Sequence, residues 1–341
     1  MAFDKSKFIA ANVADYNQSH YIEMPEFEPG MLDFLKRDTT ILNRIQTQAA
    51  LGHPTRYWEQ TKLPHNATFI NPRGGTNGKY GKDTVDDDYG RVEKSAMLKA
   101  ITSRITYTLF DKQLVTQQDV QKELFNKDMQ DMLVDIRRTQ NDSIWNGTAT
   151  DLMDTTHNDY CGLLTQITDV TTIANPFNLT EKTGEQITDA IRTKVAQALA
   201  DNKWGGRITA LYANPLTIDY LSRAELKRDG VNIMLDSEKM DLGNGFVVNT
   251  IRTQAGILPI IPDSFIPVDS TSEAGKVKHV IVGLNESLVE RHYLTSATPQ
   301  MFKMGLDAGL LDDYVAVLFD TVILKGADSH AHFQLKFNTV A

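Results

Sequence analysis

The sequence predicts an α+β fold, because the period of its apolar residues changes from two to about 3.6 along the chain. Residues 97–110 alternate, with Ile101, Ile105 and Tyr107 on one side and polar residues on the other, as in a half-buried strand. Residues 111–146 contain no glycine or proline and carry apolar residues along one helical stripe. No strand–helix–strand unit repeats, so we do not expect a sheet built from βαβ units.

Composition and charge limit the class of protein. The chain has 341 residues, of which 41% are hydrophobic and 23% charged, enough for one large core or two to three modest ones. Lys plus Arg number 35 and Asp plus Glu 44, a formal charge of −9, so there is no broad basic field to grip nucleic acid. The single cysteine, Cys161, cannot form an internal disulfide.

No segment of the sequence reads as a secretion signal or a membrane span. The first 18 residues lack the long apolar run of a signal peptide, because Asn12 and Asp15 interrupt it. No apolar run approaches the ~20 residues of a membrane helix. Together with the lone cysteine, this predicts synthesis and folding in the cytoplasm, without a membrane partner.

The first third of the chain predicts an arm, a helix and a long hairpin. Residues 1–30 are polar and read as an extended arm, and residues 31–52 suit one helical face that ends at Gly52. Residues 55–63 form a predicted strand that contains Tyr57 and Trp58. We expect this strand and the strand at 97–110 to flank residues 71–90, which would be the mobile end of a long β-hairpin.

The remaining elements follow in order. A helix is predicted over residues 111–146, begun by Asp111 and ended by Asn146-Gly147; about 36 residues at ~1.5 Å each make a rod of ~54 Å with one buried face. A second amphipathic helix covers 183–202, and a buried strand after 207 leads to a helix that opens at Asn214-Pro215. Strands are expected in 243–267, 276–285, 312–326 and 332–338.

The glycine-rich stretch 71–90 does not carry the marks of an enzyme site. It holds five glycines, three basic and four acidic residues, but no Gly-x4-Gly-Lys-Ser/Thr spacing for a phosphate loop. No buried strand leads directly into it, as a dinucleotide loop requires. Three consecutive aspartates on an extended chain alternate between faces and do not converge on a metal, so a solvated acidic patch is the favoured interpretation. These aspartates are Asp86, Asp87 and Asp88.

Three other motifs have both a chemical and a plain interpretation. His330 and His332 could be two metal ligands on one face of a strand, but a zinc site needs a third and usually a fourth ligand, so two surface histidines are favoured. The further histidines available are His157, His279 and His292. Cys161 could be a nucleophile, but no local signature supports this and a buried thiol is favoured. The pair Asp312-Asp313 precedes an apolar strand and is expected in a solvated turn.

The order of these elements resembles the major capsid proteins of tailed bacteriophages, which have the Hong Kong 97-like fold. "LYANPLTIDYLSRA" looks like the strand–Asn-Pro–helix step of the family's axial domain, "GILPIIPDSFIP" like its short Gly/Pro-rich strand pair, and "DDYVAVLFDTVILKGADSHAHFQLK" like its closing strand. By this resemblance residues 1–50 are the N-terminal arm and 51–108 the extended loop. Residues 109–160 and 285–325 form the peripheral domain with the spine helix, and 161–284 and 326–341 the axial domain.

The resemblance implies a structural protein of the virion that assembles in the host cytoplasm. Its copies would form hexamers and pentamers of an icosahedral shell around double-stranded DNA, which is held without sequence-specific contacts. Portal and scaffolding proteins are implied partners and a decoration protein is a possible one. The resemblance brings no catalytic residue, cofactor or metal.

Contacts between copies are expected in the hairpin. Isolated two-stranded hairpins are marginal in water, so the aromatic residues Tyr57, Trp58 and Tyr107 are expected to pack on a neighbouring subunit. The end of the hairpin places basic residues before acidic ones and could meet patches of both signs. The contact candidates are Tyr57, Trp58, Arg73, Lys79, Lys82, Asp86, Asp87 and Asp88.

Some alternatives stay open at this point. Some relatives join a lysine of the extended loop covalently to another subunit, but no partner asparagine or glutamate is matched here, so Lys79 and Lys82 are read as solvated charges. A cytosolic metal- or carboxylate-dependent enzyme remains an alternative function, and so does an encapsulin, a nanocompartment shell of the same fold. The triangulation number and the host do not follow from the sequence.

Overall fold

The computed structural model describes residues 40–62, 90–110, 113, 119–177, 184–201, 206–226, 250–270, 276–306 and 311–340. The chain divides into two units, Met1–Lys36 and Arg37–Ala341, and all of the described residues belong to the second. Residues 1–39 of the predicted arm and residues 71–89 at the end of the predicted hairpin lie outside the described residues.

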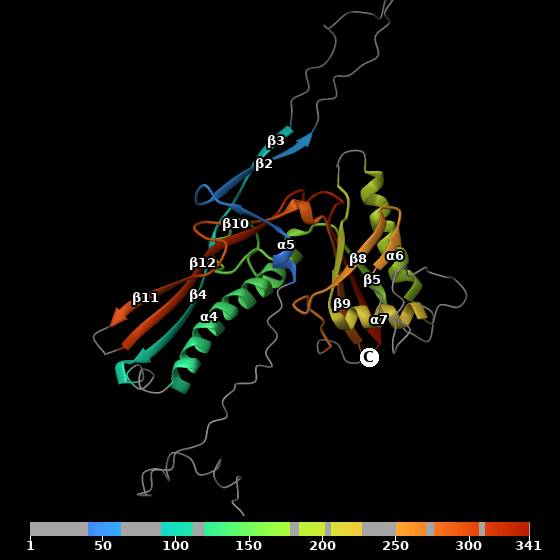
Figure 1. The fold of residues 1–341 in the computed structure, drawn as a ribbon. Coiled ribbons are helices and arrows are strands. Elements are labelled where there is room, and N and C mark those ends of the chain that lie inside the picture. Colours follow the sequence, from blue (N-terminus) through green and yellow to red (C-terminus); the bar gives the residue numbers. More distant parts are fainter. Residues whose placement is uncertain are drawn as a thin grey trace, which may run out of the picture. The chain divides into compact units, whose positions relative to one another are not determined.

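A five-stranded sheet, called here the β12 sheet, is organised around one long central strand (Figure 1). Its strands are β1 (Gln46–Ala49), β4 (Lys99–Thr108), β10 (Val289–Tyr293), β11 (Gln300–Leu306) and β12 (Leu311–Leu324). β12 pairs antiparallel with β4, β10 and β11, and β1 is parallel to β10. The turn η3 (Glu286–Leu288) immediately precedes β10.

The two aspartates near the start of β12 are buried within the strand, so the prediction of a solvated turn at Asp312-Asp313 is wrong. Both side chains are less than a tenth exposed. Asp313 Oδ1 accepts a hydrogen bond from Thr106 Oγ1 at 2.6 Å and Asp313 also pairs with Arg104, while Asp312 Oδ2 lies 3.3 Å from Lys303 Nζ. Because β12 is a central strand, cations on both neighbouring strands can pair with these carboxylates.

The long helix α4 (Asp119–Asn146) packs along one face of the β12 sheet and continues into a second core (Figure 1). Met132 and Ile136 contact Ala316 and nearby residues of the sheet, whereas Trp145 in the last turn belongs to the next core. The helix ends at Asn146 as predicted. A side chain at the following Gly147 would collide with the carbonyl of Tyr160, which explains the glycine at this helix end.

A six-stranded sheet, called here the β9 sheet, has the strand order β5-β13-β9-β6-β8-β7. Its strands are β5 (Val170–Phe177), β6 (Ala210–Ala213), β7 (Thr250–Thr253), β8 (Gly256–Pro262), β9 (Lys276–Leu284) and β13 (Phe333–Val340). Helices α6 (Gly184–Ala200) and α7 (Pro215–Leu226) share a core with one face. The short helix α5 (Leu163–Gln166) and the end of α4 share a core with alternate residues of the same strands.

The β9 sheet confirms several local predictions. β6 is buried on both faces, which is why its sequence "ALYA" does not alternate. Helix α7 begins at Pro215, and Asn214 Oδ1 accepts a hydrogen bond from Leu216 N at 3.1 Å, as an N-cap does. The predicted strands over 276–285 and 332–338 correspond to β9 and β13.

The helix predicted over 31–52 is wrong where the structure describes it. Ile41–Asn43 form a 3-10 turn (η1), and Gln46–Ala49 form strand β1. Ile41 and Ile45 are buried, so the apolar positions were identified but not their conformation. Parallel pairing with β10, a partner about 240 residues away, overrides the local periodicity.

The predicted partner of the first hairpin strand is also wrong. β2 (Thr55–Lys62) pairs antiparallel with β3 (Gly90–Ala96), and residues 97–110 supply β4 of the β12 sheet instead. Between them, Met97 N donates to Leu152 O at 2.8 Å, where the chain passes from one sheet to the other. Alternation predicts a half-buried strand but does not say with which strand it pairs.

Candidate contact surfaces

The described part of the hairpin has one face turned to its own chain and one face open. Along β2, Tyr57 is 7% exposed and Trp58 is 67% exposed. Trp58 shares its face with the exposed ion pair Arg56–Glu93, whose Nη1 and Oε1 atoms are 3.2 Å apart. An exposed tryptophan on an anchored strand is a typical candidate for a protein contact.

Tyr57 and Tyr107, which were expected to pack on a neighbour, both have packing partners within their own chain. Tyr57 belongs to a small cluster with Ala96, Ile323 and Leu152. The ring of Tyr107 meets that of Tyr314 edge-on, with centroids 6.3 Å apart, and its hydroxyl lies 2.5 Å from Asp128 Oδ2. Of the three aromatic candidates, only Trp58 keeps a large exposed surface.

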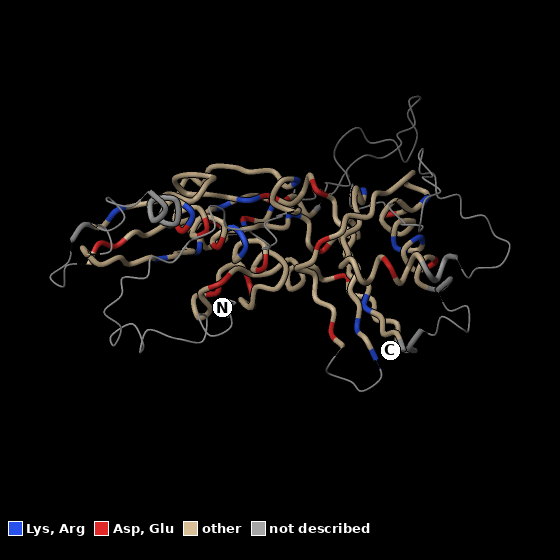
Figure 2. Tube along the Cα trace, turned by 60° about the horizontal axis from the view of Figure 1, so that its bottom comes forward, with Lys and Arg blue, Asp and Glu red and all other residues tan. Residues whose placement is uncertain are grey.

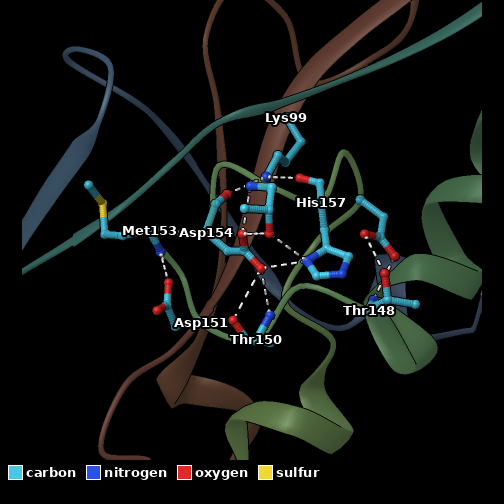
Figure 3. Close-up of polar contacts among 9 residues, drawn as sticks. Lys99, Thr148, Thr150, Asp151, Met153, Asp154 and His157 are labelled. Carbon is cyan, nitrogen blue, oxygen red and sulfur yellow. Dashed lines mark hydrogen bonds and ion pairs between the residues drawn. The ribbon is translucent and has the colours of Figure 1, made fainter.

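The loop 147–162 forms hydrogen bonds to the segment where the hairpin leads into β4 (Figure 3). Asp154 accepts hydrogen bonds from the backbone and hydroxyl groups of Thr150 and Thr156 and lies 2.7 Å from His157 Nδ1. These bonds, led by that from the Thr156 hydroxyl, hold the pKa of the Asp154 carboxyl far below its usual range. Lys99 Nζ donates to the carbonyls of Asp154 and His157 at 2.7 and 2.5 Å.

This loop also delivers Leu152 to the cluster under Tyr57, so its polar contacts position the root of the hairpin. Thr148 N and Oγ1 donate to the two carboxylate oxygens of Asp159, and Thr148 bridges to Cys161 across the loop. Nothing in the sequence of the loop indicated this role, because its partners at 97 and 99 are about 55 residues away.

A buried ionic cluster joins α4 to the β12 sheet. Asp320 is fully buried and accepts hydrogen bonds from Arg291 Nε at 2.7 Å, from the Tyr160 hydroxyl and from Gln140 Nε2. Burial raises the pKa of the Asp320 carboxyl, and the charge of Arg291 opposes that effect. The cluster fixes four segments at one point and exposes no reactive group.

The face of the β12 sheet opposite α4 carries an apolar stripe that no described element covers. We call it the open face: Phe302, Val315, Val317 and Phe319. Phe302 pairs with Val315 across the strands, and the two phenylalanines are 49% and 39% exposed. The flanking β4 residues on this face are exposed and mostly threonine. A sheet face in water normally carries polar side chains, so this stripe indicates a contact surface.

The contact candidates predicted at the end of the hairpin lie outside the described residues. They are Arg73, Lys79, Lys82, Asp86, Asp87 and Asp88.

The two histidines of the His-x-His motif have different partners and do not form a pair of ligands. His330 is exposed, and its Nδ1 lies 3.3 Å from Asp169 Oδ2. His332 is buried, which corrects the expectation of two surface histidines: its Nδ1 accepts from Asn285 N at 3.3 Å and its Nε2 donates to Lys325 O at 3.1 Å. Within the described ranges, no three His, Cys, Asp or Glu side chains lie together as metal ligands would.

Cys161 is buried, as predicted for a structural thiol. Burial raises its pKa to about 11, so the reactive thiolate is suppressed at neutral pH.

Charges of both signs are interspersed along the described elements, without separation into a basic and an acidic face (Figure 2). Among the helices that the structure describes, none is long and apolar enough to cross a bilayer.

Comparison with solved structures identifies the fold. The chain is similar to the capsid of a native GTA particle, with TM-score 0.59 and 10% identity over 96% of this chain and 99% of that one. It is also similar to the capsid of Myoviridae phage XM1, with TM-score 0.58 and 8% identity over 94% and 100% of the two chains. A structure from Mycobacterium phage Bobi matches with TM-score 0.59 and 11% identity over 92% and 95%. These likenesses confirm the predicted Hong Kong 97-like fold.

The family follows from the sequence itself. The model of the SU10 major capsid protein family matches residues 12–307, and the chain belongs to this family. A search of curated proteins finds no match. The chain is therefore a major capsid protein of a tailed phage and a structural component of the virion, as the order of its elements predicted. This favours the capsid over the enzyme and encapsulin alternatives.

Proposed function

We propose that copies of this capsid protein form hexamers and pentamers that join into an icosahedral shell around double-stranded DNA, without a catalytic step or a bound cofactor. The net charge of −9 supports a wall that encloses DNA with few direct contacts, because each phosphate contact needs a lysine or arginine. Portal and scaffolding proteins, and any decoration protein, would be separate chains, as the resemblance implies.

The two sheets correspond to the two domains of the fold in this proposal. The β12 sheet with α4 would be the core of the peripheral domain, predicted over 109–160 and 285–325. The β9 sheet with α6 and α7 would be the core of the axial domain, predicted over 161–284 and 326–341. β4 pairs with β12 along ten residues, so it would belong to the peripheral domain more closely than to the extended loop.

We further propose that Trp58 is the main anchor between neighbouring subunits, and the exposure of this side chain is the observation that carries the proposal. Its strand is fixed to its own subunit by the opposite face, so Trp58 can meet a partner with little loss of conformational freedom. Tryptophan is enriched among the residues that dominate the energy of protein interfaces. The open face supplies a complementary apolar surface on a second copy. The end of the hairpin, with its basic and acidic residues, would add polar contacts around this anchor.

Replacement of Trp58 by alanine tests this anchor. A loss of about 2 kcal/mol per contact, the lower bound for a dominant interface residue, weakens each contact about 30-fold, so shells should form poorly. Leu216→Ala is a matched control, because Leu216 is 64% exposed on α7 and far from the hairpin in sequence. The yield of shells is measured by sizing and electron microscopy, and subunit stability by circular dichroism. Undiminished shells from Trp58→Ala, at equal salt and concentration, would exclude Trp58 as the anchor.

A further inference from the structure

Apolar packing alone holds the root of the hairpin weakly. Its buried cluster contains only Tyr57, Ala96 and Ile323, with Leu152 packed against them. Two-stranded sheets of this kind are marginal by themselves. Open clefts of about 440, 520 and 190 Å³ flank the root, the first two lined by Tyr57 and the last two by Lys325. The orientation of β2 and β3 therefore needs a further source of rigidity.

A chain of polar contacts, called here the latch, runs from β2 to β10, then to Lys325 just after β12, and from there back to β2. It consists of Thr55, Tyr57, Glu290, His292 and Lys325. Thr55 Oγ1 lies 3.0 Å from His292 Nδ1, and His292 Nε2 lies 3.0 Å from Glu290 Oε2. Lys325 Nζ donates to Glu290 Oε1 at 2.6 Å and lies 6.0 Å from the centroid of the Tyr57 ring.

The bonds to Glu290 have a fixed direction. An ionised carboxylate only accepts, so His292 Nε2 and Lys325 Nζ donate to its two oxygens. Both oxygens of Glu290 are thus engaged, by an imidazole and by an ammonium. Thr55, Tyr57 and His292 are all less than a tenth exposed, and charge-assisted bonds are strong in such surroundings.

A second set of polar contacts connects β2 to the turn after β12, next to the latch. Glu59 Oε1 accepts from Gly326 N at 3.0 Å, and Glu59 Oε2 pairs with Lys94 Nζ at 2.7 Å. Gly326 has φ +68°, a left-handed conformation that favours glycine, so the turn after β12 is shaped to present this backbone N–H next to Lys325. Alternate residues of β2, at 55, 57 and 59, therefore all meet one short stretch of β10 and the turn after β12.

We propose that the latch sets the angle of the hairpin relative to the β12 sheet, with Glu290 as the positioning residue at its centre. The proposal concerns the orientation of β2 and β3 in the free subunit; only its consequence for assembly rests on the proposed role of Trp58. Without the latch, the hairpin samples many orientations and its own pairing, which is marginal by itself, opens more often, so shells form less readily.

Hydrogen exchange on the unassembled full-length chain tests the latch. Glu290→Gln removes the charge at constant size, and Lys325→Met removes the ammonium but keeps the aliphatic stem. Each should speed exchange of the amides in 55–62 and 90–96 by about tenfold, the effect of losing one such charged contact, and leave β6 and β9 unchanged. Lys303→Met is the matched control, because it breaks another lysine–carboxylate contact of β12, with Asp312, away from the hairpin.

The double variant shows whether the two residues act as one unit. If they do, Glu290→Gln with Lys325→Met speeds hairpin exchange little more than either change alone. Unchanged hairpin exchange in the single variants, an equal rise in β6 and β9, or the same effect from Lys303→Met would overturn the proposal. Trp58→Ala should not alter hairpin exchange, because Trp58 is not part of the latch. Normal shells from Trp58→Ala would therefore refute the proposed anchor without contradicting the latch, which is tested by exchange alone.

Discussion

Two buried histidines should make the subunit sensitive to mild acid. His279 lies between Thr217 Oγ1 at 2.9 Å and Thr339 Oγ1 at 3.1 Å, and its ring stacks on Tyr220 and Phe337. The hydrogen-bond partners of the His332 ring are two backbone groups, the N–H of Asn285 and the carbonyl of Lys325. Neither imidazole has a carboxylate among these contacts, and burial lowers the pKa of each from 6.5 to about 4.

The size of the effect follows from these pKa values. The folded pKa is below the unfolded one, so the unfolded chain binds more protons and the stabilisation present above pH 6.5 is lost as the pH falls toward 4. Each histidine accounts for about 2 kcal/mol between pH 7 and pH 5, and the two for about 4 kcal/mol. That is a large part of the 5–15 kcal/mol by which a typical domain is stable.

Urea unfolding of unassembled subunits at pH 7, 6 and 5 measures this loss. His279→Gln with His332→Gln removes both titrating groups. Between pH 7 and pH 5 the free energy of unfolding of this variant should therefore decrease by about 4 kcal/mol less than that of the unchanged chain, even if the variant is less stable at pH 7. His330→Gln is the control, because His330 is exposed. A double variant whose stability falls as steeply as that of the unchanged chain would refute the reasoning.

Three further outcomes are expected. Ile136→Asp should prevent soluble folding, because Ile136 is 1% exposed where α4 packs on the β12 sheet, and a buried unpaired carboxylate costs several kcal/mol. Arg137→Asp, on the exposed side of α4, should remain soluble by sedimentation and folded by circular dichroism. Arg291→Met should destabilise the subunit by about 3–5 kcal/mol in urea, because it leaves Asp320 buried and unpaired; a loss below 1 kcal/mol would contradict this. Replacement of residues 74–88 by a short Asn-Gly turn should leave the melt of the free subunit unchanged and weaken shells to salt and heat; a lower subunit melting temperature would place the segment in its own core.

The sequence predicted those elements whose signals are local. The end of α4 at Asn146, the start of α7 at Pro215 and the strands β9 and β13 each depend on capping residues or on apolar runs within a few positions. The strand at Gln46–Ala49 and the partner of β2 were not predictable in this way, because both depend on pairing with distant segments.

The exposure of the hairpin residues was predicted in part. Tyr57 and Trp58 were both named, although neighbours on a strand point to opposite faces, and this signal alone would have shown that only one of them could face outward. The burial of Asp313 depends on Arg104, which is 209 residues away, and the latch joins Thr55 to His292, which are 237 positions apart. No window of sequence contains both halves of such contacts.

Helix α4 and strand β12 each contribute to two cores, the one between α4 and the β12 sheet and the one against the β9 sheet, and this has a mechanical consequence. Ile136 and Trp145 lie in different cores on one continuous helix, and Leu318 and Leu324 do so on one continuous strand. A force applied to one sheet therefore reaches the other through a continuous helix and a continuous strand whose side chains pack in both cores, and not through a flexible linker. Under load the two sheets should deform together as one stiff plate, and the shell should yield first where one subunit meets the next.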